Sequence, residues 1–351
     1  MTHTSLATPV SIVIPTHNRL PILAQVLDAL ASQDFATESM EVIVVADGCT
    51  DGTEDAIRTR EYPFRLAIVT QDGSGAAAAR NAGAARASGT LLIFLDDDVI
   101  PTSTLVGEHV SLHRWTSRAA AVGPYLLPPQ DRPTFFGEKL RRWWEDQFEA
   151  MGHPEHQFTY RDLLSGNLSI PAAVFAETGG FNTSFPDAGG EDFEFGVRLL
   201  EANIRIAYAS RARAEHQETM DLARSFRRAR VQGAAEVKNA RLHPHVRDTL
   251  AFHTPSPTRW LIGRAPKVAR LLAAAAGGLL VPLEGLGMRR AWHRLSTAVQ
   301  HYWYWVGVAK ELGGHAKLKH VQQSLDDDLP PGAPAAEGGD SASRSVNTGN
   351  G

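Results

Sequence analysis

Four short, mainly apolar runs divide the first hundred residues of the chain. They cover residues 10–15, 42–45, 66–69 and 91–95. None of them alternates polar with apolar residues along its length, which is typical of strands buried on both faces of a parallel sheet. The segments between them, at 20–32, 53–60 and 74–86, have the composition and spacing of helices. This alternation predicts an α/β fold with a mostly parallel sheet flanked by helices.

Three polar segments follow three of these predicted strands. Residues 15–19, 47–53 and 96–98 each stand at the end of an apolar run, and Pro15 is expected to end the first strand. Ligands of open α/β sheets bind outside the carboxyl ends of the strands. We therefore expect the three segments to meet at one edge of the sheet.

The last of these segments is a run of three aspartates. If the strand continues through them, Asp96 and Asp98 point to one side and Asp97 to the other. Two carboxylates on one side are suitable ligands for Mg²⁺ or Mn²⁺. For three adjacent acids on their own, a solvated acidic turn is the alternative.

The cysteine content and the N-terminal sequence bear on the cellular compartment in which the protein is expected. Cys49 is the single cysteine, which excludes an internal disulfide framework and a cysteine-based zinc site. Residues 1–8 have neither a basic start nor an apolar run, so they do not resemble a signal peptide. We expect a flexible N-terminus and a cytoplasmic protein.

Charge is unevenly distributed along the chain. Residues 211–325 contain 19 Lys and Arg against 7 Asp and Glu, a balance of +12, so the remainder carries −16 of the total of −4. A basic C-terminal third indicates an anionic partner: a phosphate-bearing substrate, an acidic membrane surface or nucleic acid. No nucleic-acid recognition motif occurs there, so nucleic acid is not the expected partner.

The C-terminal helical region, residues 221–323, leaves two interpretations open. Residues 271–283 carry no charge but are too few to span a bilayer, so they fit a buried helix pair or an interfacial segment. Basic and Trp/Tyr-rich helices within 259–314 fit a peripheral membrane anchor or a packed helical subdomain. The composition of residues 324–351 predicts a disordered tail.

Aromatic residues are concentrated between residues 102 and 165. Pairs occur at Phe135-Phe136 and Trp143-Trp144, followed by Phe148. A lid over a site and a packed helix are the two interpretations, and packing is the favoured one.

Six motifs in order resemble the family 2 glycosyltransferases. They are IVIPTHNR at 12–19, VVADGCTDGT at 44–53, ARNAG at 79–83, FLDDD at 94–98, GNLS at 166–169 and GED at 190–192. The resemblance covers residues 9–220 and implies a GT-A, Rossmann-like fold, here with a C-terminal helical extension. It implies a metal-dependent, inverting transfer from a nucleoside-diphosphate sugar, by default a UDP-sugar, to a saccharide or lipid-linked acceptor.

The resemblance also assigns the donor site. The residues that it places around the nucleotide sugar are Pro15, Thr16, His17, Asn18, Arg19, Asp47, Arg80, Asn81, Asp96 and Asp97. Asp47 would accept a hydrogen bond from the base, although alone it also fits a helix cap. The family's usual acid and serine are replaced by Ala46 and Cys49, which leaves the base open. Arg80 alternatively fits an exposed helix position.

The remaining assignments concern the metal, the acceptor and catalysis. Asp98 would bind Mg²⁺ or Mn²⁺, with Asp96 and His216 as further ligands. Asp192 would be the general base that removes a proton from the acceptor hydroxyl. The residues expected at the acceptor are Gly166, Asn167 and Glu191. For Glu191 and Asp192 alone, charge at a helix N-terminus is the alternative, and Arg224, Arg227 and Arg228 fit either a phosphate site or a solvated face.

Two other functions were weighed against glycosyl transfer at the inner face of the cell membrane. A sugar-phosphate nucleotidyltransferase needs a glycine-rich basic loop after the first strand, and residues 15–19 are not such a loop. A membrane-associated protein that binds nucleotide sugars without turnover would not need the acids at 98 and 192.

Overall fold

The computed structural model describes residues 9–131, 133–185, 189–218, 221–250 and 256–326. A seven-stranded sheet forms its centre, in the order β3-β2-β1-β4-β8-β6-β9. The strands are β1 (Val10–Thr16), β2 (Met40–Asp47), β3 (Arg65–Gln71), β4 (Leu91–Leu95), β6 (Ala119–Val122), β8 (Asn167–Pro171) and β9 (Arg205–Tyr208). All neighbours pair in parallel except β8, which is antiparallel to β4 and β6. The predicted α/β fold with a mostly parallel sheet is confirmed.

The central strands are mainly apolar, and both of their faces are covered. Ile12, Val44 and Phe94 are fully buried in β1, β2 and β4. Pro15 does not end β1 as predicted, since the strand continues to Thr16. The pairing of β1 with β4 stops at Val13, so no ladder bond to β4 is required of the proline.

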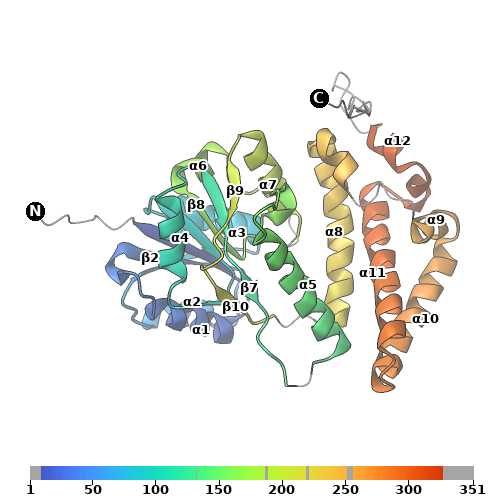
Figure 1. Ribbon diagram of the computed structural model, residues 1–351, viewed down its shortest axis with the longest axis horizontal. Helices are drawn as coiled ribbons and strands as arrows, with labels where there is room; N and C mark the ends of the chain where they lie inside the picture. Colours follow the sequence, from blue (N-terminus) through green and yellow to red (C-terminus); the bar gives the residue numbers. More distant parts are fainter. Residues whose placement is uncertain (1–8, 132, 186–188, 219–220, 251–255, 327–351) are drawn as a thin grey trace, which may run out of the picture.

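Helices cover the two faces of the sheet (Figure 1). They are α1 (Leu20–Ala31), α2 (Thr53–Thr59), α3 (Ala76–Arg86), α4 (Leu105–His113), α6 (Ala172–Glu177) and α7 (Glu191–Glu201), with single turns η1 (Thr37–Ser39) and η2 (Tyr160–Asp162). The alanine-rich α3 packs very closely on β1. A Cβ atom at Gly83 would lie 2.3 Å from Cγ1 of Val13, so only glycine fits there.

A small second sheet brings the end of the domain back to the acidic run. It consists of β5 (Val99–Pro101), β10 (Ala214–His216) and β7 (Tyr125–Leu126). His216 pairs with Val99, and the backbone N–H of Gln217 donates to the carbonyl oxygen of Asp98 at 2.7 Å. This pairing places His216 beside the aspartates although more than a hundred residues separate them.

The aromatic segment forms the helix α5 (Phe135–Met151). Trp144 and Phe148 are buried against Tyr125, while Trp143 is half exposed. The packed-helix interpretation is therefore correct.

The C-terminal region is a helical unit beside the sheet domain. It comprises α8 (Leu222–Leu242), η3 (Pro244–Thr249), α9 (Pro257–Arg264), α10 (Pro266–Gly285), α11 (Arg289–Glu311), η5 (His315–His320) and α12 (Val321–Asp326). The helices α8, α11 and α10 lie side by side beyond α5 (Figure 1). Because α12 reaches Asp326, the first residues of the expected disordered tail are helical; residues 327–351 and the expected flexible N-terminus, 1–8, lie outside the described residues.

Two glycines allow α8 and α11 to cross in close contact. A Cβ atom at Gly307 would lie 1.9 Å from the carbonyl oxygen of Arg230, and one at Gly233 would lie 2.1 Å from that of Tyr304. Val237 and Val308 are fully buried in the core that this crossing creates. This core lies mainly within the helical unit, and Tyr160 and Val197 of the sheet domain complete it.

Helix α10 exposes its apolar residues. Among the described residues it is the one helix long and apolar enough to cross a membrane, by length and composition alone. Leu271 is 71% exposed and Val281 is 76% exposed. The buried-helix interpretation of this segment is wrong, because only 11% of its apolar 18-residue window is buried, although α10 packs on α11 and α9.

Candidate active site

The acidic run forms a turn at the end of β4. The strand stops at Leu95, and the aspartates occupy the turn that leads into β5. The expected alternation of side chains therefore does not apply. Arg19 Nη1 lies 2.9 Å from Oδ1 of Asp97 and 2.6 Å from Oδ2 of Asp98, whereas Asp96 pairs with Arg80.

The two aspartates that share Arg19 differ in proton affinity. Burial raises the pKa of Asp97 to about 6, although Arg19 and a 2.7 Å hydrogen bond from the Thr16 hydroxyl oppose the rise. Burial alone would also raise the pKa of Asp98, but His216 and Arg19 outweigh it and hold the pKa below its ordinary value. Asp98 therefore remains an anion at neutral pH, as a cation ligand must.

His216 lies between two carboxylates. Its Nε2 atom is 3.6 Å from Oδ1 of Asp98 and 3.7 Å from Oε2 of Glu218. Its Nδ1 atom is buried without a hydrogen-bond partner, and the rings of Tyr125 and Trp144 pack edge-on against it, each with centroids 5.4 Å away. Glu218 was not predicted from the sequence; it follows the end of β10, where strand alternation no longer fixes the direction of a side chain.

The donor set around His216 has the chemistry of a divalent-cation site. Imidazole and carboxylate are ligands that Mn²⁺ accepts, and carboxylate also suits Mg²⁺. Across the ranges that the structure describes, no three His, Cys, Asp or Glu side chains are grouped closely enough to hold a metal by themselves. The residues fit the implied ion as partial ligands, with room for oxygen atoms of a substrate.

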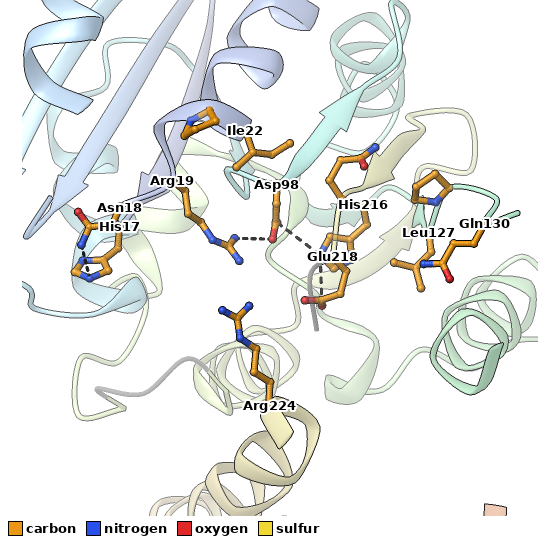
Figure 2. Close-up of a pocket in the computed structure, with 13 residues that line it drawn as sticks. His17, Asn18, Arg19, Ile22, Asp98, Leu127, Gln130, His216, Glu218 and Arg224 are labelled. Atoms are coloured by element: carbon orange, nitrogen blue, oxygen red, sulfur yellow. Dashed lines mark hydrogen bonds and ion pairs between the residues drawn. The ribbon is translucent and has the colours of Figure 1, made fainter. Parts of the chain in front are cut away.

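A cavity of about 670 Å³ opens beside this cluster. It is lined by His17, Asn18, Arg19, Pro21, Ile22, Asp98, Leu127, Pro128, Gln130, His216, Gln217, Glu218 and Arg224. Figure 2 shows Arg19 pointing toward Asp98 and Arg224 extending from α8 toward the same space. This volume is in the range of small-molecule sites, and α8 of the helical unit forms part of its wall.

A second acidic cluster surrounds Arg80. Its guanidinium contacts Oδ1 of Asp96 at 2.7 Å and Oε1 of Glu191 at 3.2 Å. The negative charge of Asp192 also helps to raise the pKa of Arg80. Arg80 is 4% exposed, so the surface-helix alternative is wrong. Oε2 of Glu191 accepts from the backbone N–H of Gly189 at 2.7 Å, so both carboxylate oxygens of Glu191 have partners.

One carboxylate oxygen of Asp192 accepts a hydrogen bond, and the other has no hydrogen-bond partner. It stands in the first turn of α7, where Oδ2 accepts from the backbone N–H of Ser165 at 3.1 Å and Oδ1 is buried without a hydrogen bond. Burial, together with the negative charge of Glu191, raises the pKa of Asp192 to about 7. A carboxylate with this pKa can take a proton near neutral pH.

The two loops expected at the nucleoside, after β1 and after β2, are joined by polar contacts. His17 Nδ1 lies 2.5 Å from the carbonyl oxygen of Asp47, and Oδ1 of Asn18 accepts from the backbone N–H of Thr50 at 2.7 Å. Asn18 has φ of 54°, in the left-handed region that asparagine tolerates. Thr16 is buried against Asp97, and Pro15 lies below it in β1, so only residues 17–19 of this segment line the cavity.

Asp47 is largely engaged by the loop that opens α3. Its oxygens accept from Gln71 Nε2 at 2.7 Å and from the backbone N–H groups of Ser74 at 2.6 Å and Gly75 at 2.8 Å. A carboxylate has about four acceptor positions, so one remains for the N–H of a base. The cap interpretation is wrong, because the next helix, α2, has Gly52 at its N-cap without a side-chain hydrogen bond, and Asp47 binds the loop before α3 instead.

Two expected site residues, Asn81 and Asn167, are bound within the fold and do not line the cavity. Asn81 exchanges two hydrogen bonds with the backbone of Phe181. Asn167 is fully buried, bound to His109 and to the carbonyl oxygen of Ala212.

Gly166, by contrast, borders the acidic cluster. A Cβ atom there would lie 3.0 Å from Asp96 Oδ2 and 3.0 Å from the hydroxyl of Tyr125. Tyr125 is a neighbour of the site that the sequence pattern did not single out, and burial, together with the charges of Asp96 and Asp192, raises its pKa.

Comparison with known proteins identifies relatives of this region. A family model described as glycosyl transferase family 2 matches residues 11–179, and one described as the N-terminal domain of galactosyltransferase matches residues 147–221. Validoxylamine A glucosyltransferase of Streptomyces hygroscopicus subsp. jinggangensis is 34% identical over 242 residues, 60% of this chain and 56% of that protein. Glycosyltransferase AglE of Haloferax volcanii is 34% identical over 204 residues, 57% of this chain and 64% of that protein.

The fold also has a relative among solved structures. The mannosyltransferase PcManGT from Pyrobaculum calidifontis, in complex with GDP-Man and Mn²⁺, matches with a TM-score of 0.57 at 20% identity over 88% of each chain. This likeness shows the fold, the GT-A arrangement that the sequence resemblance implied. The chain spans only about half the length of the validoxylamine glucosyltransferase that it matches.

Proposed function

Because this chain belongs to glycosyl transferase family 2, we propose that it transfers a sugar from a nucleoside-diphosphate sugar to a hydroxyl of a saccharide or lipid-linked acceptor. The transfer inverts the anomeric carbon and uses Mg²⁺ or Mn²⁺. A UDP-sugar is the default donor, because the departures at Ala46 and Cys49 leave the choice of base unassigned.

The observation that carries the proposal is that two acids in separate clusters, Asp98 on the cavity and Asp192 beside Arg80, differ in surroundings and have opposite pKa shifts. Asp98, on the cavity, has a lowered pKa and stays charged. Asp192 has a pKa raised to about 7 and an unpartnered buried oxygen. A cation site requires the first property, and a general base that works near neutral pH requires the second.

These properties support a single displacement. Asp192 Oδ1 takes the proton of the acceptor hydroxyl, and the hydroxyl oxygen forms a bond to the anomeric carbon as the bond from that carbon to the diphosphate oxygen breaks. The divalent cation, when bound, neutralises charge that builds on the leaving diphosphate. Asp98 and His216 would hold the cation, Asp96 would reach the ribose or the cation, and residues 17–19 and Arg224, which line the cavity, would border the diphosphate.

The acceptor is proposed to approach from the side of Gly166 and Glu191. Gly166 adjoins Asp96 and follows Ser165, whose backbone N–H binds Asp192, while Glu191 precedes Asp192 and binds Arg80. Because Asn167 is buried and Glu191 is bound to Arg80 and Gly189, their proposed role at the acceptor is to shape the backbone of this wall.

A panel of nucleotide sugars tests the proposed function. Incubation with Mn²⁺ and an acceptor pool from cell extract should release a nucleoside diphosphate and yield a glycosylated product, and chelation with EDTA should stop the release. Full turnover by both Asp98→Asn and Asp192→Asn would refute the assignment of the site. Calorimetric binding of a nucleotide sugar with no turnover on any acceptor would instead favour the non-catalytic alternative.

We also propose that the helical unit rests on an anionic membrane surface at the cytoplasmic side. Helix α10 exposes an uncharged apolar face, and Arg264, Lys267, Arg270, Arg289 and Arg290 stand at its two ends. Apolar faces bordered by cations are what interfacial helices use to bind acidic lipid. The free Cys49 fits a reducing compartment.

A further inference from the structure

The first turns of α8 carry a dense positive charge. Residues 222–235 contain no acidic residue, and their basic residues are Arg224, Arg227, Arg228 and Arg230. Like charges three or four residues apart destabilise a helix, and cations near its N-terminus are disfavoured by the helix dipole. This arrangement is unfavourable for the helix by itself, which indicates an anionic partner.

Arg228 lies on the face of α8 that is turned toward the sheet domain. Arg224 lines the cavity, and Val231, two turns further along, meets the loop before α7: a Cβ atom at Gly189 would lie 3.4 Å from its Cγ1 atom. Arg228 stands between these two positions on the same face of the helix. It is therefore placed between the cavity and the start of α7, where Asp192 lies.

The surroundings of Arg228 leave its guanidinium accessible beside the acids. Burial, together with the charges of Asp96 and Asp192, raises the pKa of Tyr125, and the charge of Arg228 opposes this rise. A guanidinium has five N–H donors, and the 3.9 Å ion pair of Nη1 with Glu218 is too long to use one of them. The side chain of Arg228 is 54% exposed, so these donors can reach a ligand.

The same end of α8 adjoins the exposed apolar surface of α10. Phe226 of α8 packs against a cluster that includes Leu280 of α10 and Trp292 of α11. Leu286, directly after α10, is 74% exposed. Figure 1 shows α8, α11 and α10 side by side. The arginines and an uncovered apolar surface thus belong to one end of the helical unit.

We propose that Arg228, with Arg227 beside it, binds the phosphate of a lipid-linked saccharide acceptor whose lipid chain lies along the apolar surface of α10 and whose sugar hydroxyl faces Asp192. The inference rests on the proposed function and narrows its acceptor to one class. A phosphate linked to a lipid supplies an anion for the arginines and an apolar chain for the exposed surface. A free saccharide would use neither.

The competing explanation is that Arg228 only compensates the charge of Glu218. In that case the loss of Arg228 should lower stability and leave phosphate binding unchanged. The variant Arg228→Lys separates the two explanations. Lysine keeps a positive charge near Glu218 but lacks the planar fork of donors that binds a phosphate at two points.

The experiment measures the binding of farnesyl phosphate, a short isoprenoid phosphate, to the full chain by calorimetry. Farnesol and inorganic phosphate test the two parts of this probe separately, and each should bind the wild type at least about tenfold more weakly. Arg228→Gln should weaken binding of farnesyl phosphate about 10- to 100-fold, as expected for loss of a hydrogen bond to a charged group. UDP binding in the presence of Mn²⁺ should be unchanged, because Arg228 is not among the residues that line the cavity.

The matched control is Arg230→Gln, which removes an exposed arginine from the same helix two residues further along, away from the face of Arg228. Its affinity for farnesyl phosphate should equal that of the wild type. An equal loss in Arg230→Gln would show a general charge effect and overturn the inference.

Each remaining outcome also decides the inference. Unchanged affinity in Arg228→Gln overturns it, and so does equally tight binding of inorganic phosphate or of farnesol to the wild type. Loss of UDP affinity in Arg228→Gln would place this arginine at the donor instead. These results leave the proposed function standing, which fails separately if the wild type neither binds nor turns over a nucleotide sugar. If Arg228→Gln does not fold, Arg228→Lys decides: weaker binding of farnesyl phosphate supports the inference, and unchanged binding overturns it.

Discussion

Arg80 Nη2 donates a 2.7 Å hydrogen bond to Oδ1 of Asp96, and the Arg80 side chain is almost completely buried. The other terminal nitrogen of Arg80 contacts Glu191, so α3 holds the end of β4 and the start of α7 together. Since Asp192 follows Glu191, this buried cation sets the distance between the donor side and the proposed base.

Asp192→Asn should lower kcat by about 10²–10⁴-fold, which is the usual contribution of a general base. Binding of the nucleoside diphosphate should change little, since the side chain does not line the donor cavity. Steady-state kinetics and calorimetry with UDP measure the two effects separately. Equal losses of turnover and UDP affinity would contradict the role assigned to Asp192.

Glu191→Gln should move the acidic limb of the pH–activity profile to lower pH. Asp192 must be deprotonated to accept a proton, so activity rises with pH through its pKa of about 7. The charge of Glu191 contributes to raising that pKa, and its removal favours the deprotonated form. The ratio of activity at pH 6 to that at pH 8 should increase.

The control for this shift is Glu177→Gln, which removes an exposed carboxylate whose partner is Arg118 rather than Arg80. Its profile should match the wild type. A limb that stays in place in Glu191→Gln would show that Glu191 does not act on the group that titrates.

Arg19→Gln should destabilise the fold by about 1–3 kcal/mol, because it leaves buried acceptors without their charged partner. Asp97 and Asp98 would then face each other without the cation they share. Denaturant unfolding at pH 7.5 measures the loss. Arg58→Gln, which breaks an exposed pair with Glu54, should change stability by less than about 0.5 kcal/mol.

Much of this architecture is readable from the sequence because it depends on local patterns. The apolar runs of β1, β2 and β4 and the helix of residues 222–242 show in composition and spacing. The family motifs additionally predict Asp98 and Asp192 as site residues. What the sequence did not reveal depends on contacts between distant segments.

Three examples show why those contacts could not be predicted. Arg80 lies on a helix whose pattern also fits an exposed face, and only the packing of α3 against the acids turns it inward. The alternation rule failed at residues 96–98 because the strand ends one residue earlier. Glu218 and Tyr125 enter the site through the pairing of β10 with β5 and β7, which no local pattern specifies.

Gly307→Ala should destabilise the protein by about 1–3 kcal/mol, the usual result of overpacking. The added methyl group would overlap the carbonyl oxygen of Arg230, so α8 and α11 would have to separate. Gly277→Ala in α10 is the control: no atom lies within 4 Å of the added carbon, and higher helix propensity should stabilise it by about 0.5–1 kcal/mol. Melting temperatures that shift in the same direction for both variants would contradict the close helix contact.

Val281→Asp should weaken binding to vesicles of anionic lipid by about tenfold or more, because burial of a valine side chain is worth about 1.5–3 kcal/mol. Val281 lies on the exposed face of α10. Vesicle flotation measures the effect, with Trp115→Asp as the control, since Trp115 is exposed after α4 in the sheet domain. Equal flotation of wild type and Val281→Asp would refute the proposed membrane surface.

Helix α8 contributes both to the cavity and to the core of the helical unit. Its first turns carry Arg224 to the cavity, and its later turns are fastened to α11 at Gly233. The two matched family models end at residues 179 and 221, the second just before this helix. Chimeras that exchange sheet domains between relatives at that point would therefore replace only part of the donor site. A crossover that preserves the cavity has to carry α8 and α11 together with the sheet.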